Sequence, residues 1–391
     1  MLRAGAEVVP IAGELEEFPN AVRVREEDDP LYPHWRSSCT IPDDALMALR
    51  KHDYNASPNG LTPAIVSLLK RWIDIVWVGT FTPVAVDLLR HFQGGVVLRT
   101  YGGYPYTGSL GPWPMREEAL RLLSSSDGYV FCPALPYQGL VEDSRLTRGE
   151  TYWPACVSAS RLGHVWKAEA SEPVACETIS LIERYRRQVY EQYVSHFGDL
   201  PLRIFGQNPV GGPDGDQRIV GTMSDDAYNK AIASCRVMLY AGLGTKYHLH
   251  YHVLEALIMR VPVVFFETSA LAHIAMFSGL AREELRASGM CSSIAEARDV
   301  TARLLQSPQA AIGLSERQGA IRSIFEPSAW DGVVANLIAC FERRSKYKRQ
   351  FADSSDQPPE AGLHALGAAA LSAVHRSGMA MLARLGSRKP R

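Results

Sequence analysis

Apolar and polar positions follow two rhythms along this chain. Short runs of β-forming residues alternate with longer segments in which apolar residues recur at helical spacing. The predicted strands cover residues 73–78, 96–100, 128–132, 155–161, 202–205, 218–221, 237–241 and 262–266. The predicted helices cover residues 61–71, 83–91, 114–123, 177–197, 225–234, 270–277 and 293–305. Such alternation is typical of parallel, doubly wound sheets, so the predicted fold class is α/β.

The chain length indicates more than one domain. Its 391 residues exceed what one hydrophobic core usually holds. We predict two Rossmann-like domains over residues 1–150 and 151–350, with residues 155–161 as the first strand of the second. The last helices of the second domain have the length to cross back to the first.

Residues 351–391 are predicted to be a linker followed by a basic amphipathic tail. The tail has no acidic residue after position 360 and ends in several arginines and a lysine. A helix of this composition can lie on an anionic membrane surface. The alternative is a helix packed on the body of the protein, or a frayed terminus.

Composition narrows the class of protein further. The net charge is −1 and the pI is about 6.8, so no global field favours nucleic acid as a partner. The seven cysteines are scattered and form no CxxC, which indicates a reducing compartment and no cysteine-based zinc site. The chain start lacks the apolar run of a signal peptide, and no segment reaches the roughly 20 apolar residues of a membrane span. We therefore expect a cytoplasmic protein, at most peripheral on the inner face of a membrane.

The stretch 241–266 carries the densest candidate chemistry. A glycine-bearing loop with Gly242 and Gly244 leads into a short amphipathic helix, with Glu255 predicted in its first turn. A glycine loop before a helix N-terminus is a typical anion site, because free N–H groups and the helix dipole converge there. Three histidines, His248, His250 and His252, occupy alternate positions in this stretch. On an extended segment they would share one side and could bind zinc, although no carboxylate or cysteine lies next to them.

Three segments resemble the GT-B glycosyltransferases with a Glu-x7-Glu motif, the family 4-like group. They are residues 218–226 (RIVGTMSDD), residues 233–240 (ASCRVMLY) and residues 253–264 (VLEALIMRVPVV). The resemblance spans roughly residues 200–270. Two positions depart from the motif: Tyr247 stands where the family has its first Glu, and Arg260 where it has a Gly.

The resemblance implies two Rossmann-like domains that face each other across a cleft. The first would bind the acceptor, and the second a nucleotide-sugar donor. The implied reaction moves a sugar to a hydroxyl of a glycan, a lipid-linked or a small-molecule acceptor, without a metal and without any cofactor besides the donor substrate. Two alternatives stay open: a sugar-nucleotide epimerase of the same architecture, and a catalytically silent partner or chaperone module.

The resemblance also implies roles on the donor side. Glu255 would accept hydrogen bonds from ribose hydroxyls, or it would only complement the helix dipole. The histidines would hydrogen-bond diphosphate or sugar oxygens, or they would be buried structural residues. The charge that grows on the leaving diphosphate needs cations nearby. The candidate residues would either supply them or be solvated surface charges. The candidate cations are Arg161, Lys167 and Lys246, and the segment that would contact the base is Gly221, Thr222 and Met223.

In the first domain, the ends of the predicted strands mark the expected ligand edge. The residues at those ends are Gly79, Thr80, Tyr101, Gly102 and Gly103, and Arg99 is expected to face the cleft. Asp53 would be the general base for an inverting reaction, or a turn-forming residue. Asp53 and His250 are therefore the candidate catalytic residues.

Overall fold

The structure is a computed structural model. It describes residues 39–52, 54, 61–79, 82–102, 105–181, 186–212, 214–241, 248–339 and 341. These residues divide into two compact units. Unit 1 contains the described residues up to Trp153 together with those from Trp330 onward, and unit 2 is Pro154–Ala329. The predicted tail at 351–391 lies outside the described residues.

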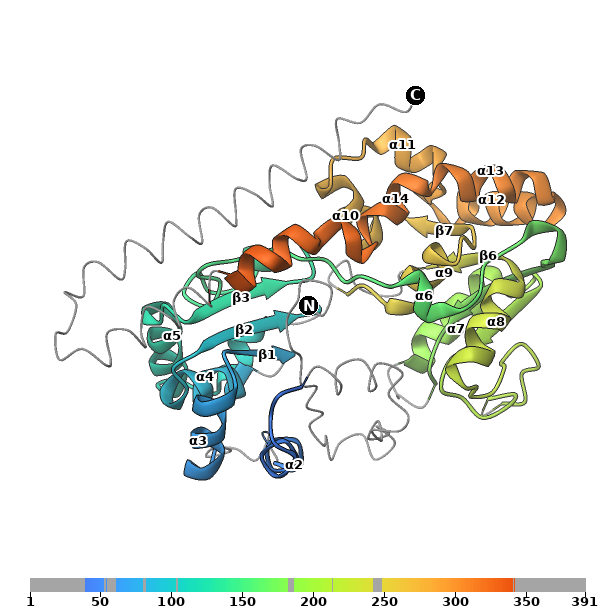
Figure 1. Cartoon of the computed structure of the whole chain (residues 1–391). Coiled ribbons are helices and arrows are strands. Elements are labelled where there is room, and N and C mark those ends of the chain that lie inside the picture. The colour runs from blue at the N-terminus through green and yellow to red at the C-terminus, as the bar shows by residue number, and fades with distance from the viewer. Residues whose placement is uncertain are drawn as a thin grey trace, which may run out of the picture. The chain divides into compact units, whose positions relative to one another are not determined.

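Unit 1 is built on a parallel sheet of three strands in the order β1-β2-β3 (Figure 1). The strands are β1 (Ile75–Gly79), β2 (Gly95–Thr100) and β3 (Tyr129–Pro133). The α-helices that precede or connect them are α2 (Asp43–Lys51), α3 (Pro63–Trp72), α4 (Thr82–His91) and α5 (Met115–Ser125). Two 3-10 turns follow the strand ends, η3 (Tyr106–Leu110) and η4 (Gln138–Leu140).

Both faces of this sheet are covered, which explains why every residue of β2 is buried. Leu98 lies on one face, in the core that also contains Leu49 and Leu88. Val97 lies on the other face, against Leu337 and Phe341. Leu337 lies in a helical segment at 331–339 that belongs to unit 1, and Phe341 follows that segment.

Unit 2 contains five parallel strands in the order β5-β4-β6-β7-β8. They are β4 (Glu172–Thr178), β5 (Leu202–Phe205), β6 (Cys235–Tyr240), β7 (Val263–Phe266) and β8 (Met290–Cys291). The first strand of the unit therefore lies between the second and the third. This order has its topological switch point between β4 and β6, where connections leave in opposite directions.

Helices and turns connect the strands of unit 2 (Figure 1). They are α6 (Ala159–Leu162), η5 (Ala168–Ala170), α7 (Arg186–Phe197), α8 (Asp225–Ser234), α9 (Tyr251–Ile258), α10 (Ala270–Phe277), α11 (Arg282–Ala287), α12 (Ile294–Gln306), α13 (Pro308–Arg317) and α14 (Gly319–Ile324). A final turn, η6 (Pro327–Trp330), ends at the unit boundary. Serine caps begin several of these helices: Ser224, Ser269 and Ser307 each accept a hydrogen bond from the backbone three residues later.

The parallel sheets in both units confirm the α/β fold class. The predicted strand at 155–161 is wrong, because α6 occupies its second half and the first strand of unit 2 is β4. The predicted helix at 177–197 starts too early, since β4 extends to Thr178 and α7 begins at Arg186. The predicted strand at 218–221 is reduced to one bridge between Ile219 and Ile204. β4 was hard to recognise because polar residues occupy both of its ends and only positions 175–177 are fully buried.

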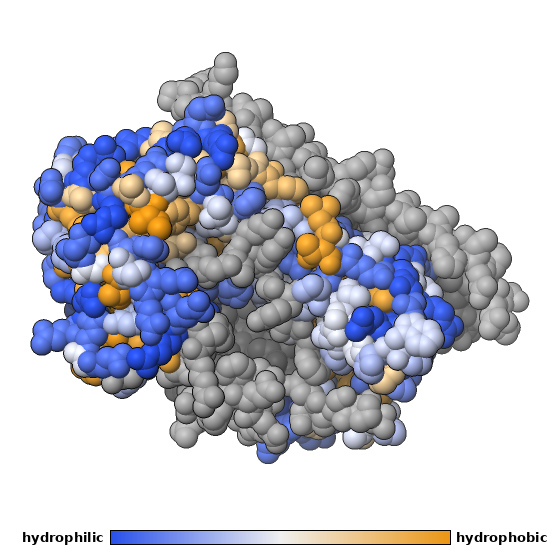
Figure 2. Space-filling model, turned by 180° about the vertical axis from the view of Figure 1, so that it is seen from behind, coloured by the Kyte–Doolittle hydropathy of each residue, from blue (hydrophilic) through white to orange (hydrophobic). Residues whose placement is uncertain are grey.

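Within the described part of the chain, no helix combines the length and apolarity that crossing a membrane requires. On the face seen in Figure 2, hydrophilic residues predominate and hydrophobic residues form small separate groups.

Candidate functional site

The candidate site of unit 2 lies at the carboxyl ends of β4 and β6. In open parallel sheets, ligands bind outside the carboxyl ends of the strands at the switch point. Here β4 ends with Glu177 and Thr178, and β6 ends with Tyr240, which Ala241 follows. His250 and His252 meet these strand ends through hydrogen bonds and ring contacts.

Glu177 is the most deeply buried acidic group at this site, with 2% of its surface exposed. Its Oε1 accepts hydrogen bonds from the Thr178 backbone N–H at 2.8 Å and from His252 Nε2 at 3.1 Å. Its Oε2 accepts the Ala241 backbone N–H at 3.0 Å. A buried carboxylate is tolerated only when such donors replace water. Sequence reasoning missed this residue, because it assigned Glu177 to the start of a helix.

His250 is the N-cap residue of α9 and has an extended backbone. Its Nε2 lies 3.3 Å from Arg186 Nη1, and its Nδ1 lies 3.1 Å from the Tyr240 hydroxyl. A guanidinium only donates, so Nε2 must accept and the ring proton is on Nδ1. Burial, followed by the charges of His252, His248 and Arg186, lowers the pKa of His250 to about 2. His250 is therefore a neutral imidazole that orients Arg186, a residue not predicted from the sequence.

The three predicted histidines do come together. The ring centroids of His248 and His250 are 4.5 Å apart, and those of His250 and His252 are 5.0 Å apart and stacked. The ring of Tyr240 contacts His250 and His252 at 5.9 and 5.8 Å. Among the described residues, no group of three or more His, Cys, Asp or Glu side chains is arranged to hold a metal ion.

Glu255 lies on α9, one turn later than predicted, and the first turn of that helix has no acidic residue. Its side chain is half-buried and makes no hydrogen bond or ion pair with any described residue. Burial raises the pKa of Glu255, while the charges of His252 and Arg161 lower it and that of Asp225 raises it. The fold thus brings Arg161 near Glu255 and leaves the oxygens of this carboxylate available as acceptors.

Lys167 lies at the opposite edge of the sheet from this cluster. The preceding residue, Trp166, donates its backbone N–H to Met259 O at 2.8 Å and its indole N–H to Cys235 O at 3.0 Å. Cys235 is the first residue of β6, so this segment passes the amino ends of the strands. The structure therefore separates Lys167 from Arg161, the other candidate cation among the described residues.

The predicted base-contacting segment is tied to the loop after β5. Thr222 Oγ1 lies 3.1 Å from both the backbone N and the backbone O of Asn208, and its own N–H donates to Asn208 O at 2.8 Å. Gly221 allows a close approach, since a Cβ there would be 2.5 Å from Val210 Cγ2. Met223 is 40% exposed.

Asn208, which sequence reasoning did not single out, connects this segment to the loop after β4. It is buried, its Oδ1 accepts the Leu181 N–H at 2.6 Å, and its Nδ2 donates to Ile179 O at 2.8 Å. Thr222 therefore contributes to the shape of the site through Asn208.

Arg99 in unit 1 is buried, with 6% of its surface exposed. Its Nη1 donates to Cys132 O at 3.3 Å and also to Trp153 O. Its guanidinium carbon lies 5.2 Å from the centroid of the Tyr101 ring and 5.0 Å from that of Trp153. Carbonyl oxygens and aromatic rings of its own unit therefore enclose Arg99.

Other predicted residues of unit 1 lie at the expected sheet edge. Gly79 ends β1, and a Cβ there would meet none of the described residues within 4 Å. Gly102 has φ 103°, a conformation that favours glycine, and its carbonyl accepts the Tyr106 hydroxyl at 2.8 Å. Outside the described residues lie Asp53, Thr80, Gly103, Gly242, Gly244 and Lys246.

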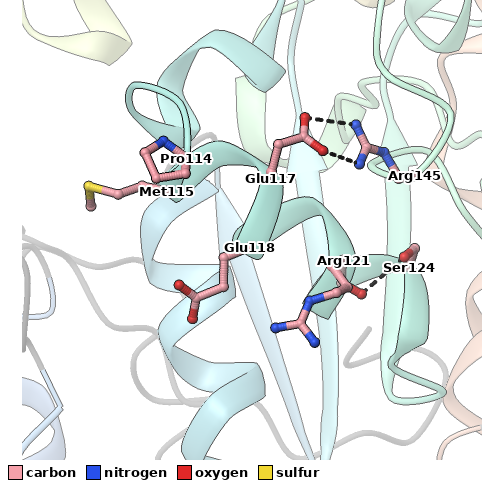
Figure 3. A pocket seen from close by; sticks show the side chains of 7 residues that line it. All are labelled: Pro114, Met115, Glu117, Glu118, Arg121, Ser124 and Arg145. Atoms are coloured by element: carbon pink, nitrogen blue, oxygen red, sulfur yellow. Dashed lines mark hydrogen bonds and ion pairs between the residues drawn. The ribbon is translucent and has the colours of Figure 1, made fainter.

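An open pocket on α5 contains none of the predicted site residues. Its lining is Pro114, Met115, Glu117, Glu118, Arg121, Ser124 and Arg145. Figure 3 shows Glu117 and Arg145 facing each other, with Arg145 Nη1 2.7 Å from Glu117 Oε2. Both side chains are substantially exposed, which is typical of a surface ion pair.

Comparisons with known proteins identify no family for this chain. No family model matches it, and no curated protein matches it. Among solved structures it is similar to the N-terminal domain of Candida albicans trehalose-6-phosphate phosphatase, with 10% identity over 72% of this chain and 73% of that chain and a TM-score of 0.49. It is also similar to α,α-trehalose 6-phosphate synthase from Burkholderia multivorans (12% identity, 84% and 82%, TM-score 0.45). A third similar structure is WaaG, a glycosyltransferase involved in lipopolysaccharide biosynthesis (11% identity, 64% and 79%, TM-score 0.43).

Proposed function

We propose that unit 2 binds a nucleotide-sugar at the carboxyl ends of β4 and β6, and that the protein transfers the sugar to an acceptor hydroxyl without a metal. One observation carries the proposal: Glu255 is a half-buried carboxylate at the switch point that has no hydrogen-bonding partner among the described residues. The resemblance of residues 253–264 to a glycosyltransferase motif supports the same assignment.

Glu255 fits a pair of ribose hydroxyls. A carboxylate accepts two hydrogen bonds at once, and a vicinal diol supplies two donors at matching distance. Burial removes water from the Glu255 carboxylate and thereby raises its pKa. Donation by two hydroxyls would compensate for the water that burial has removed.

Arg186 fits the leaving diphosphate. It is the first residue of α7, and the neutral ring of His250 accepts one of its N–H groups. As the bond between the anomeric carbon and the diphosphate oxygen breaks, negative charge grows on the diphosphate, which a fixed guanidinium stabilises. The new bond joins the anomeric carbon to the acceptor oxygen, and the hydroxyl proton passes to a base or to the departing diphosphate.

Unit 1 is then the acceptor-binding unit. Its sheet edge carries Gly79, at the end of β1, and Gly102. The acceptor is a glycan, a lipid-linked or a small-molecule hydroxyl compound. Asp53 remains the proposed base for an inverting reaction.

The donor site is tested by measuring thermal stabilisation of the full chain with UDP, GDP, CMP and dTDP. We expect one nucleotide to raise the melting temperature of the wild type, and Glu255→Ala to lose that rise. Glu283→Ala, at an exposed position of α11, is the matched control and should keep it. Stabilisation by none of the four would refute the donor site, and an unchanged rise in Glu255→Ala would refute the role of Glu255.

A second measurement separates transfer from the two alternatives. With the donor that contains the stabilising base, a transferase releases nucleoside diphosphate in proportion to glycosylated acceptor. An epimerase changes the sugar without releasing the nucleotide, and a silent module binds without turnover.

A further inference from the structure

The buried carboxylate of Glu177 has no part in the proposed chemistry, although it lies at the centre of the site. Three elements converge on it: Thr178 of β4, Ala241 directly after β6, and His252 of α9. We propose that Glu177 is a positioning residue for the proposed donor site. It holds Ala241, where the loop after β6 begins, and His252 on α9. These contacts fix the orientation of α9, which determines the direction of the Glu255 side chain.

Both oxygens of the Glu177 carboxylate act as acceptors in these contacts. Two of its three donors are backbone N–H groups, which cannot reverse their role. The third, His252 Nε2, must therefore also donate to this acceptor. Glu177 thus fixes the proton of His252 on Nε2, in the way that carboxylates fix the tautomer of ligand-binding histidines.

A gain in the free energy of unfolding is a weak explanation for burying the Glu177 carboxylate. Removing a carboxylate from water costs several kcal/mol before its partners compensate, and apolar replacements of buried ion pairs are often no less stable. What the carboxylate adds is geometry, because it joins the ends of two neighbouring strands at the switch point to α9.

The effect reaches Glu255 through α9. His252 and Glu255 are three residues apart and share a helix face. Burial raises the pKa of Glu255 and the neighbouring His252 opposes that rise, so the two side chains lie within electrostatic reach of each other. His252 also stacks on His250, which holds Arg186, and so the proposed ribose and diphosphate contacts both depend on how His252 is held.

Glutamine cannot replace this carboxylate without a conflict. If its NH2 group takes the place of Oε2, it meets the Ala241 N–H, and if it takes the place of Oε1, it meets the Thr178 N–H. Glu177→Gln should therefore displace one of the held segments while changing the side-chain volume very little. Glu172→Gln is the matched control, because Glu172 begins the same strand and pairs with Arg203 at the opposite edge of the sheet.

The test measures the affinity of the full-length protein for whichever of UDP, GDP, CMP and dTDP stabilises the wild type. We expect Glu177→Gln to weaken the affinity by about tenfold or more, as loss of a residue behind a ligand-contacting group usually does. Glu172→Gln should keep the affinity within about twofold. The ¹⁵N spectrum of labelled histidines, with His252 assigned from His252→Asn, should show the Nε2-protonated ring in the wild type and its loss in Glu177→Gln.

The outcomes distinguish this inference from the function on which it rests. If the wild type binds none of the four nucleotides, the proposed function fails and this inference fails with it. If the wild type binds but Glu177→Gln binds equally well, or if Glu172→Gln is weakened as much, only this inference is overturned. Should Glu177→Gln not fold, His252→Asn tests the same link from the α9 side, and unchanged affinity in that variant would overturn it.

Discussion

Both units have a charged residue at the same edge of a parallel sheet, but the surroundings of the two residues differ. In unit 1, Arg99 is enclosed by the carbonyl oxygens of Cys132 and Trp153 and by two aromatic rings. In unit 2, Glu255 at the switch point has no hydrogen-bonding partner among the described residues. A charge enclosed by its own unit serves that unit's stability, whereas a carboxylate without a partner is available to a ligand.

The largest effect is expected where a buried charge is removed from unit 1. Arg99→Ala should lower the free energy of unfolding by about 3 kcal/mol, because two buried carbonyls lose their donor. Urea denaturation measures this change. Arg90→Ala, which breaks an exposed pair with Asp87, is the control and should change the unfolding free energy by less than about 1 kcal/mol.

The contrast between Arg99 and Glu255 would be wrong if Arg99→Ala kept the wild-type free energy of unfolding but lost sugar transfer. Arg99 would then belong to the acceptor site, as the sequence first suggested.

A smaller effect is expected on turnover in unit 2. Arg186→Gln should lower kcat about a hundredfold, because the guanidinium proposed to meet the growing charge is gone, while the nucleotide Kd changes less. Steady-state kinetics and nucleotide titration separate the two quantities. A loss of nucleotide affinity with kcat unchanged would instead assign Arg186 to ground-state binding.

His250 gives unit 2 a characteristic pH dependence. Its pKa in the folded protein is lowered to about 2, below the unfolded value of about 6.5, so the unfolded chain binds the extra proton first. Its contribution to stability is therefore complete above pH ~6.5 and is lost as the pH falls toward 2, at up to about 1.4 kcal/mol per pH unit. Urea denaturation between pH 7.5 and 5 should show a shallower loss for His250→Asn than for the wild type.

The control for this pH dependence is Val165→Ala, at an exposed position of the same unit, which removes no ionisable group. This variant should retain the wild-type slope. If His250→Asn also retains it, His250 is not held neutral in the folded protein.

The smallest effect is expected at Lys167. Because its segment passes the amino ends of the strands, Lys167→Ala should leave nucleotide affinity within about twofold of the wild type. Arg161→Ala should weaken it severalfold, since Arg161 interacts electrostatically with Glu255. Isothermal titration at low salt resolves both values. If Lys167→Ala weakened nucleotide affinity more than Arg161→Ala, the two edges of the sheet would not differ in the way that the contacts indicate.

Local sequence patterns were enough to predict the fold class and several individual elements. The helix at Ala270–Phe277 has the predicted bounds, and Ser293 caps α12 as its position before an apolar-periodic segment indicates. The cluster of His248, His250 and His252 was also found, because these residues are close in the chain. Periodicity and capping act over a few residues, and so they can be read without the fold.

Only the tertiary structure decided which polar side chains come into contact. Glu177 and His252 are 75 residues apart, and Arg186 and His250 are 64 apart, so no local pattern could pair them. The order β5-β4-β6, which creates the switch point, also depends on strands that are distant in sequence. β4 itself was missed because its polar ends are stabilised by neighbouring strands and by buried hydrogen bonds, which only the folded chain supplies.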